Sequence, residues 1–231
     1  MGRADKPAGR SSMAVVAEVR RRAGGTRTGH AGTLDPLATG VLVLGLGAAT
    51  KQIDRFMSTD KAYRTRIDLS AFTSTDDREG ERELVDVAEP PTKEAIEAAL
   101  ETFRGTIQQV PPAYSAVKVG GQRAYRLARG GASPELAPRT VVVHALRIMS
   151  YEWPILELSL RCAKGFYVRS LARDLGRALG TGGYCIEIER SAVGPFTLAD
   201  AMSLDALPVP LTEDALLSLE EALDRVSEHM G

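Results

Sequence analysis

The segment over residues 29–47, GHAGTLDPLATGVLVLGLG, concentrates residue types that could do chemistry. Glycine-rich loops of this kind hold functional side chains or let another backbone approach closely. Pro36 favours an extended conformation at Asp35, and Leu34 and Leu37 are expected to anchor the loop on either side. An aspartate in that setting is held firmly, and its charge is partly desolvated. An Asp-Pro pair also opens ordinary turns, so spacing alone favours a structural role for Asp35.

Several elements are expected to position this loop. Ser11 and Ser12 can cap a helix through MAVVAEVRRRA, which the glycines at 24 and 25 would end. Residues 41–46 are expected to form a buried strand, and residues 61–70 an alternating strand. The polar stretch over 73–83 is expected to be a loop. Further expected elements are a helix capped by Thr92, strands over 140–150 and 156–162, a helix over 166–180, a strand over 184–189 and a last amphipathic helix over 216–230.

These elements do not alternate as they do in a parallel, doubly wound sheet. The pattern therefore predicts an α+β fold with a mixed, mainly antiparallel central sheet flanked by helices. The length of 231 residues is enough for one large domain or two small ones.

The net charge of −1 hides an uneven distribution. Residues 1–67 hold 12 lysines and arginines against 5 acidic residues, and residues 113–200 hold 12 against 7. These two segments could form one positive face for a polyanion, although an ordinary mixed surface is the alternative. We see neither an apolar run of membrane-spanning length nor a secretory signal, so a cytoplasmic protein is expected. Cys162 and Cys185 lack the spacing of zinc ligands and are expected to be free core thiols.

The run GHAGTLDPLATGVLVLGLGAATK resembles the nucleophile motif of the TruB family of tRNA pseudouridine synthases. DKPAGRSS, KAYR, PPAYSAVKVGGQRAYRLARGG and CAKGFYVRSLARDLG agree with the family in the same order, so the resemblance covers about residues 5–200. It implies the pseudouridine synthase fold, with a catalytic domain over 1–200 and a possible inserted subdomain around 68–139. Residues 201–231 would then be an acidic C-terminal tail or helix, with no separate RNA-binding domain.

The resemblance implies an isomerase that converts uridine to pseudouridine at position 55 in the T-loop of tRNAs, without metal or cofactor. Asp35 matches the family's catalytic aspartate. Tyr63 matches the tyrosine that stacks on the target uracil and is a candidate for the proton transfers. Arg169 matches the arginine that pairs with the nucleophile and keeps it ionised.

The resemblance also implies substrate or RNA contacts at His30, Tyr167, Lys6, Lys61, Arg64 and Arg190. His30 matches the histidine that approaches the RNA loop where the uridine leaves its stack. Lys6 belongs to the element that supports the floor of the site. Lys61 and Arg64 are plausible phosphate contacts, although solvated strand charges would look the same.

The sequence departs from the family in places. Only MGRA precedes DKP, so the first strand is expected to be short, absent or mis-started. Glu189 stands where the first arginine of a late strand is usual, while Arg190 remains. The expected partner is the T-stem-loop of tRNA, with neither a membrane nor an obligate protein partner. A tRNA-folding chaperone and a synthase acting on another RNA are the alternatives.

Overall fold

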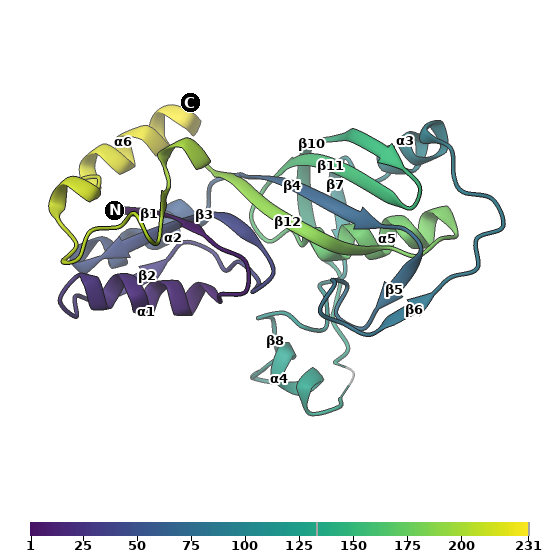
Figure 1. Ribbon diagram of the computed structural model, residues 1–231, viewed down its shortest axis with the longest axis horizontal. Coiled ribbons are helices and arrows are strands. Elements are labelled where there is room, and N and C mark those ends of the chain that lie inside the picture. The colour runs from purple at the N-terminus through teal and green to yellow at the C-terminus, as the bar shows by residue number, and fades with distance from the viewer. Residues whose placement is uncertain (133, 231) are drawn as a thin grey trace. The chain divides into compact units, whose positions relative to one another are not determined.

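The computed structural model describes residues 1–132 and 134–230, and the chain divides into two compact units. Unit 1 comprises residues 1–63 and 188–231, and unit 2 comprises residues 64–187. Two strands, β4 (Lys61–Asp68) and β12 (Tyr184–Val193), run from one unit into the other (Figure 1). Each unit contains both helices and strands, which confirms the predicted α+β class.

Unit 1 is built on the strand order β14-β1-β3-β12. β1 is antiparallel to β3, whereas β14 is parallel to β1 and β12 is parallel to β3, so this part of the sheet is mixed. Short strands β2 and β13 pair with β3 and β12. The elements of unit 1 besides β4 and β12 are β1 (Gly2–Lys6), α1 (Ser12–Arg22), β2 (Thr28–His30), β3 (Thr39–Leu46), η1 (Gly47–Gln52), α2 (Ile53–Met57), β13 (Phe196–Thr197), η2 (Leu198–Asp200), β14 (Met202–Ser203), η3 (Glu213–Ala215) and α6 (Leu219–Met230).

Strand β3 is buried on both faces. Its side chains alternate between the two faces of the sheet, and each face packs into an apolar cluster. Val41 and Val43 belong to an apolar cluster that includes residues of α6. Leu42 and Leu44 belong to a second cluster that includes residues of α1. Figure 1 shows α1 and α6 on opposite sides of the strands of this unit. The continuous apolar run therefore forms the buried strand that was predicted over 41–46.

The predicted start of α1 is confirmed: Ser11 is its N-cap and accepts a hydrogen bond from the Ala14 N–H. The last thirty residues also belong to unit 1. Met202 and Ser203 pair with β1, and Ala222 and Val226 of α6 are buried in the first apolar cluster. The first strand, whose presence the sequence left open, is present as the five residues of β1.

Unit 2 is built on β4, β11, β10 and β7, and both pairs within β11-β10-β7 are antiparallel. The hairpin of β10 and β11 matches the predicted strands over 140–150 and 156–162. The predicted loop over 73–83 lies mostly between the short strands β5 and β6. The elements of unit 2 besides β4 and β12 are β5 (Ala71–Thr73), β6 (Arg82–Leu84), α3 (Lys93–Glu101), β7 (Gly105–Gln109), β8 (Lys118–Val119), β9 (Gln122–Arg123), α4 (Ala124–Arg129), β10 (Arg139–Glu152), β11 (Ile155–Cys162) and α5 (Val168–Leu179).

Helix α5 carries the longest buried face of unit 2. Leu171 and Leu175 have no exposed surface, and the helix contacts α3, whose Ile96 and Leu100 are equally buried. Gly180 ends α5 in the left-handed conformation, as the glycines at this position predicted. Cys162 and Cys185 are buried and free, as expected. In the part of the chain that the structure describes, no helix is long and apolar enough to cross a membrane.

Candidate active site

Asp35 opens a turn at the centre of the glycine-rich loop. The Ala38 N–H donates to the Asp35 carbonyl over 3.1 Å, and Pro36 occupies the second position of this turn. Leu34 and Leu37 are buried on either side, as predicted, whereas Asp35 is only half-buried. The turn thus anchors the backbone through its leucines and leaves the carboxylate partly accessible.

The segment that follows β1 fixes this turn from one side. The Ser12 hydroxyl accepts a hydrogen bond from the Leu34 N–H at 2.8 Å and donates to the Leu34 carbonyl at 2.9 Å. The Gly9 N–H donates to the Pro36 carbonyl at 2.8 Å. Backbone groups on both sides of Asp35 are therefore held by residues of the DKPAGRSS stretch.

Lys6 lies beneath the same turn, with none of its surface exposed. Its ammonium donates to the carbonyls of Pro7, Arg10 and Pro36. A buried ammonium must have such partners, because an uncompensated charge in the interior is costly. Lys6 therefore holds the backbone of the Asp35 turn through the Pro36 carbonyl. This burial gives no support to its predicted contact with RNA, because the charge is turned into the protein.

Arg190 clamps the two ends of the loop. Its Nε donates to the Val41 carbonyl at 2.8 Å, and its Nη2 donates to the Gly32 carbonyl at 3.2 Å. Only 1% of this residue is exposed. Because Gly32 and Val41 bracket Asp35 in the chain, one guanidinium fixes the span of the loop.

The glycines of the loop make room for β12. Arg190 pairs with Gly40 in the parallel register of β12 and β3. A Cβ at Gly40 would lie 2.3 Å from the Arg190 carbonyl oxygen, and Gly40 has a φ of +102°. Gly32 has the same φ, and a Cβ there would lie 3.5 Å from Nη1 of Arg190. Gly40 therefore allows the close approach of a second backbone that the glycine pattern predicted, whereas at Gly32 only the positive φ favours glycine.

Tyr63 and Asp35 are brought into the electrostatic field of Arg190. Burial lowers the pKa of the Arg190 guanidinium, while a hydrogen bond with Tyr63 and the charge of Asp35 act in the opposite direction. Two of the predicted catalytic residues thus share one buried arginine within unit 1. Sequence reasoning placed Arg190 among the contacts of the pocket but did not show that it organises the pocket.

His30, at the end of β2, lies close to the same guanidinium. Burial lowers the pKa of His30, and the charge of Arg190 lowers it further, against a hydrogen bond with the Gly32 backbone. Its Nδ1 is buried and has no hydrogen-bond partner among the described residues. The imidazole is therefore kept neutral, because a proton on it would add a second positive charge beside Arg190.

This arrangement gives a pH-dependent stability with a defined sign. The unfolded chain binds a proton at the ordinary His pKa near 6.5, whereas folded His30 binds it only at lower pH. Its contribution to stability is thus complete above pH 6.5 and is lost as the pH falls through the folded pKa. When the pH is lowered from about 7.5 to about 5, the free energy of unfolding is expected to fall less in His30→Gln than in wild type. Urea titrations at the two pH values measure both decreases. His144→Gln, at an exposed histidine of unit 2, is the control, and equal losses in wild type and His30→Gln would contradict the expectation.

The two cations that flank Tyr63, Lys61 and Arg64, differ in their exposure. Lys61 is 7% exposed, and its ammonium donates to the carbonyls of Met57 and Thr59, both at 2.6 Å. It therefore satisfies carbonyls at the end of α2, and its phosphate contact is not supported. Arg64 is exposed, as a phosphate contact must be.

Tyr167 and Arg169 lie at the start of α5 in unit 2. The side-chain amide of Gln109 accepts a hydrogen bond from the Tyr167 N–H at 2.8 Å and donates to the Tyr167 carbonyl at 3.0 Å. Gln109 is buried and thus fixes the residue that caps the helix. Nothing in the spacing of the sequence pointed to this glutamine.

Arg169 is 3% exposed and binds two segments of unit 2. It donates to the carbonyl of Thr75 at 2.8 Å and to that of Tyr114 at 2.9 Å, and it lies 3.5 Å from a carboxylate oxygen of Asp77. Asp35 belongs to the other unit, so its pairing with Arg169 stays a prediction. The ion pair of Asp77 with Arg169 was not predicted, because the charged neighbours of Asp77 had the composition of a surface loop.

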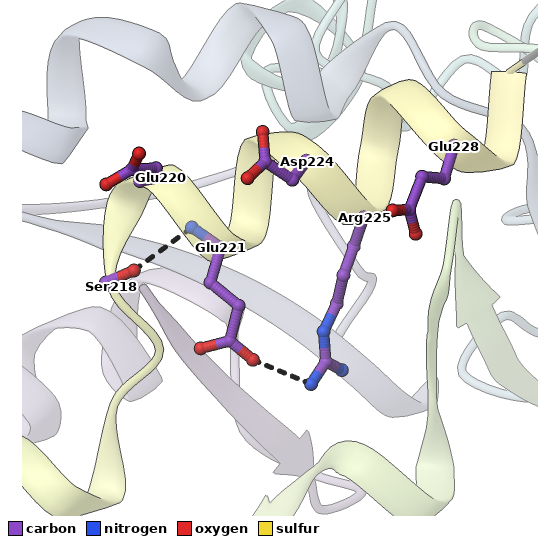
Figure 2. A pocket seen from close by; sticks show the side chains of 6 residues that line it. All are labelled: Ser218, Glu220, Glu221, Asp224, Arg225 and Glu228. Atoms are coloured by element: carbon purple, nitrogen blue, oxygen red, sulfur yellow. Dashed lines mark hydrogen bonds and ion pairs between the residues drawn. The ribbon is translucent and has the colours of Figure 1, made fainter.

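A surface hollow on α6 has a different chemistry. Within it, Arg225 donates to Glu221 at 2.9 Å (Figure 2). Its carboxylates would repel an RNA backbone. The side chains that line it are Ser218, Glu220, Glu221, Asp224, Arg225 and Glu228.

The fold matches that of chains in two solved complexes. A chain in the crystal structure of a Cbf5-Nop10-Gar1 complex superposes with a TM-score of 0.74 at 26% identity, over 97% of this chain and 62% of that one. A second match, to a chain in the structure of an H/ACA RNP bound to a substrate RNA, has a TM-score of 0.69 at 23% identity and bears on the fold alone. The class of protein is defined by two family models, both of pseudouridylate synthases.

The chain belongs to the TruB family of pseudouridylate synthases. The model of the family's N-terminal domain matches residues 20–168, and that of the tRNA pseudouridylate synthase B C-terminal domain matches residues 169–226. A tRNA pseudouridine synthase B of Caulobacter sp. (strain K31) is 48% identical over 96% of this chain and 73% of the relative. That of Thermobifida fusca is 46% identical over 95% and 76%. The protein is thus an isomerase that converts uridine to pseudouridine in RNA.

Proposed function

We propose that the substrate is the T-stem-loop of tRNA and that the target is the uridine at position 55. The observation that carries this proposal is the Asp35 turn, held through Leu34 and Pro36 and closed by Arg190. The relatives named tRNA pseudouridine synthase B support the choice of tRNA over another RNA. Since the cytoplasm is where such an RNA is found, we propose that location too.

The reaction requires little besides a placed carboxylate. The bond between uracil N1 and ribose C1′ breaks, the base turns, and C5 bonds to C1′; the C5 proton is then lost and N1 takes up a proton, so that substrate and product are isomers. In our proposal Asp35 is the nucleophile, and its covalent adduct is broken again when the C5–C1′ bond has formed. Three routes to the adduct are open: attack on C6 of the base, attack on C1′ of the sugar, or formation of the adduct after a glycal intermediate. Arg169 would keep the carboxylate ionised and orient it through a bidentate contact.

The base must leave its stack before it can react. Extrusion costs on the order of a few kcal/mol, and less from a loop than from a duplex. We propose that the half-buried ring of Tyr63 stacks on the extruded uracil and that its phenol assists the proton transfers. His30 would meet the RNA where the uridine departs, and Tyr167 would line the pocket. Basic side chains on the surface would offset the remaining cost.

The direct test uses a T-stem-loop transcript tritiated at uracil C5, because isomerisation releases that tritium to water. Wild-type protein is expected to release it in proportion to the pseudouridine formed. Binding of the transcript without release would contradict the proposed reaction and favour a tRNA-folding chaperone. Release from an rRNA fragment but not from the T-stem-loop would contradict the proposed substrate.

Arg64 gives a second test, which concerns binding. Arg64→Gln is expected to weaken binding of the transcript and to reduce the slope of log K against log salt by about 1, since one phosphate contact is lost. Binding can be followed by fluorescence anisotropy over a salt series. Lys93→Gln removes an exposed cation at the start of α3 and serves as the control. An unchanged slope in Arg64→Gln would exclude Arg64 from the interface.

A further inference from the structure

Helix α5 carries a second arginine that the proposed reaction does not use. Arg173 follows Arg169 by four residues, so both lie on the same face of the helix. Arg173 is 9% exposed, although it lies in the interior of a helix where a long apolar side chain would fill the same space. A buried arginine at such a place requires partners that hold it there.

The two arginines bind the same two segments of unit 2. The first segment is 75–77, where Arg169 contacts Thr75 and Asp77 as described above, and Arg173 donates to Asp76 at 2.9 Å. The second segment is 110–114, where Arg169 donates to the Tyr114 carbonyl and Arg173 donates to the Val110 carbonyl at 2.9 Å. One face of the helix thus binds both segments, and each of the two arginines contacts both of them.

The neighbouring aspartates have different partners. Asp77 accepts from the Thr75 hydroxyl at 2.6 Å and the Glu79 N–H at 3.0 Å, in addition to the ion pair with Arg169. Asp76 has a φ of +59°, an unusual conformation for a residue other than glycine. Burial raises the pKa of Asp76, and the charges of Arg173 and then Arg169 act against this rise. Both arginines therefore act on Asp76.

Removal of Arg173 alone would leave Asp76 as a largely buried carboxylate without its ion-pair partner. Such a group is costly, and the remaining cation nearby is Arg169. Arg169 would then be drawn from Asp77 toward Asp76. Its hydrogen bonds to the Thr75 and Tyr114 carbonyls would be strained in the same movement, because they depend on the present position of the guanidinium.

We infer that Arg173 is a positioning residue for the isomerisation: it neutralises Asp76, so that Arg169 keeps its place beside Asp77. The inference rests on the function proposed for Arg169, the orientation of the Asp35 carboxylate. Arg173 touches neither substrate nor nucleophile in this account, and its effect on the reaction passes through Arg169.

The experiment is a charge-deletion cycle in the full chain, read by tritium release from the T-stem-loop transcript. Arg173→Gln is expected to lower kcat about 10- to 100-fold, the size of effect that supporting residues around a site have, and to leave KM within about threefold. Asp76→Asn combined with Arg173→Gln is expected to return kcat to within about threefold of wild type, since the competing charge of Asp76 is then gone. Arg173 also donates to Asp174, but that carboxylate is more exposed and lies 3.8 Å from Arg177. In an Arg169→Gln background, Arg173→Gln should cause no further loss.

Arg104→Gln is the matched control. Arg104 also bridges two carboxylates, Glu97 and Glu101, and donates to a main-chain carbonyl, that of Leu146. Its loss should lower the melting temperature without lowering kcat. If kcat falls as much in Arg104→Gln as in Arg173→Gln, the effect of Arg173 is a general loss of stability, and the inference is overturned.

Two further outcomes overturn it. The first is an Arg173→Gln variant with unchanged kcat. The second is a double variant that is no better than Arg173→Gln. If Arg173→Gln does not fold, the double variant decides: folded protein with near-wild-type kcat supports the inference, and failure to restore folding and kcat rejects it. Absence of release by wild type would reject the proposed function itself, which is a distinguishable result.

Discussion

Asp35→Asn is expected to abolish tritium release from the T-stem-loop transcript, with a loss in kcat of about 10⁴-fold or more. The carboxamide has nearly the shape of the carboxylate, and the backbone hydrogen bonds of Leu34, Asp35 and Pro36 that hold the turn do not depend on the charge of that side chain. The fold and the turn should therefore survive. What is lost is the ability to form a covalent bond through an anionic oxygen.

Binding separates a nucleophile from a structural aspartate. The variant should bind the transcript within about tenfold of wild type, because stacking and phosphate contacts supply most of the affinity. Asp54→Asn, at an exposed aspartate in the first turn of α2, removes the same charge from the same unit and should retain full release. Unfolding of Asp35→Asn, or loss of binding together with activity, would make Asp35 a turn residue and not the nucleophile.

The loop around Asp35 could be predicted in detail because its determinants are local. Pro36 restricts its predecessor, and two leucines on either side of a turn bury themselves. The capped start of α1 and the buried run of β3 depend on residues that are close in the chain. The mixed, mainly antiparallel sheet follows from the order of such elements. For this part of the molecule, sequence and structure agree.

The roles of the cations could not be read in this way. Lys6 and Lys61 belong to a residue type that binds phosphate, but each is turned inward to satisfy backbone carbonyls. Arg190 meets the Asp35 loop only because β12 lies in one particular register on β3. Burial and register are set by contacts distant in the chain, which periodicity does not contain. Gln109 and Asp77 escaped notice for the same reason.

That register can be tested at Gly40, where the second large effect is expected. A Cβ at this position would lie 2.3 Å from the Arg190 carbonyl oxygen and 2.9 Å from the Arg190 backbone nitrogen, closer than such atoms approach without a shift. The obstacle is backbone on a neighbouring strand, so no side-chain rotation can relieve it. Gly40→Ala is therefore expected to reduce the free energy of unfolding by about 4 kcal/mol, from overpacking added to an unfavourable φ.

Gly24→Ala separates these two contributions. Gly24 follows α1 with a φ of +62°, but a Cβ there would meet nothing within 4 Å. It should lose only the conformational part, about 1–2 kcal/mol. Urea titrations of both variants measure the difference, and equal losses would mean that β12 does not approach Gly40 as described. A larger loss in Gly40→Ala, with tritium release reduced further than the folded fraction explains, ties the close approach of the strands to the clamp that holds Asp35.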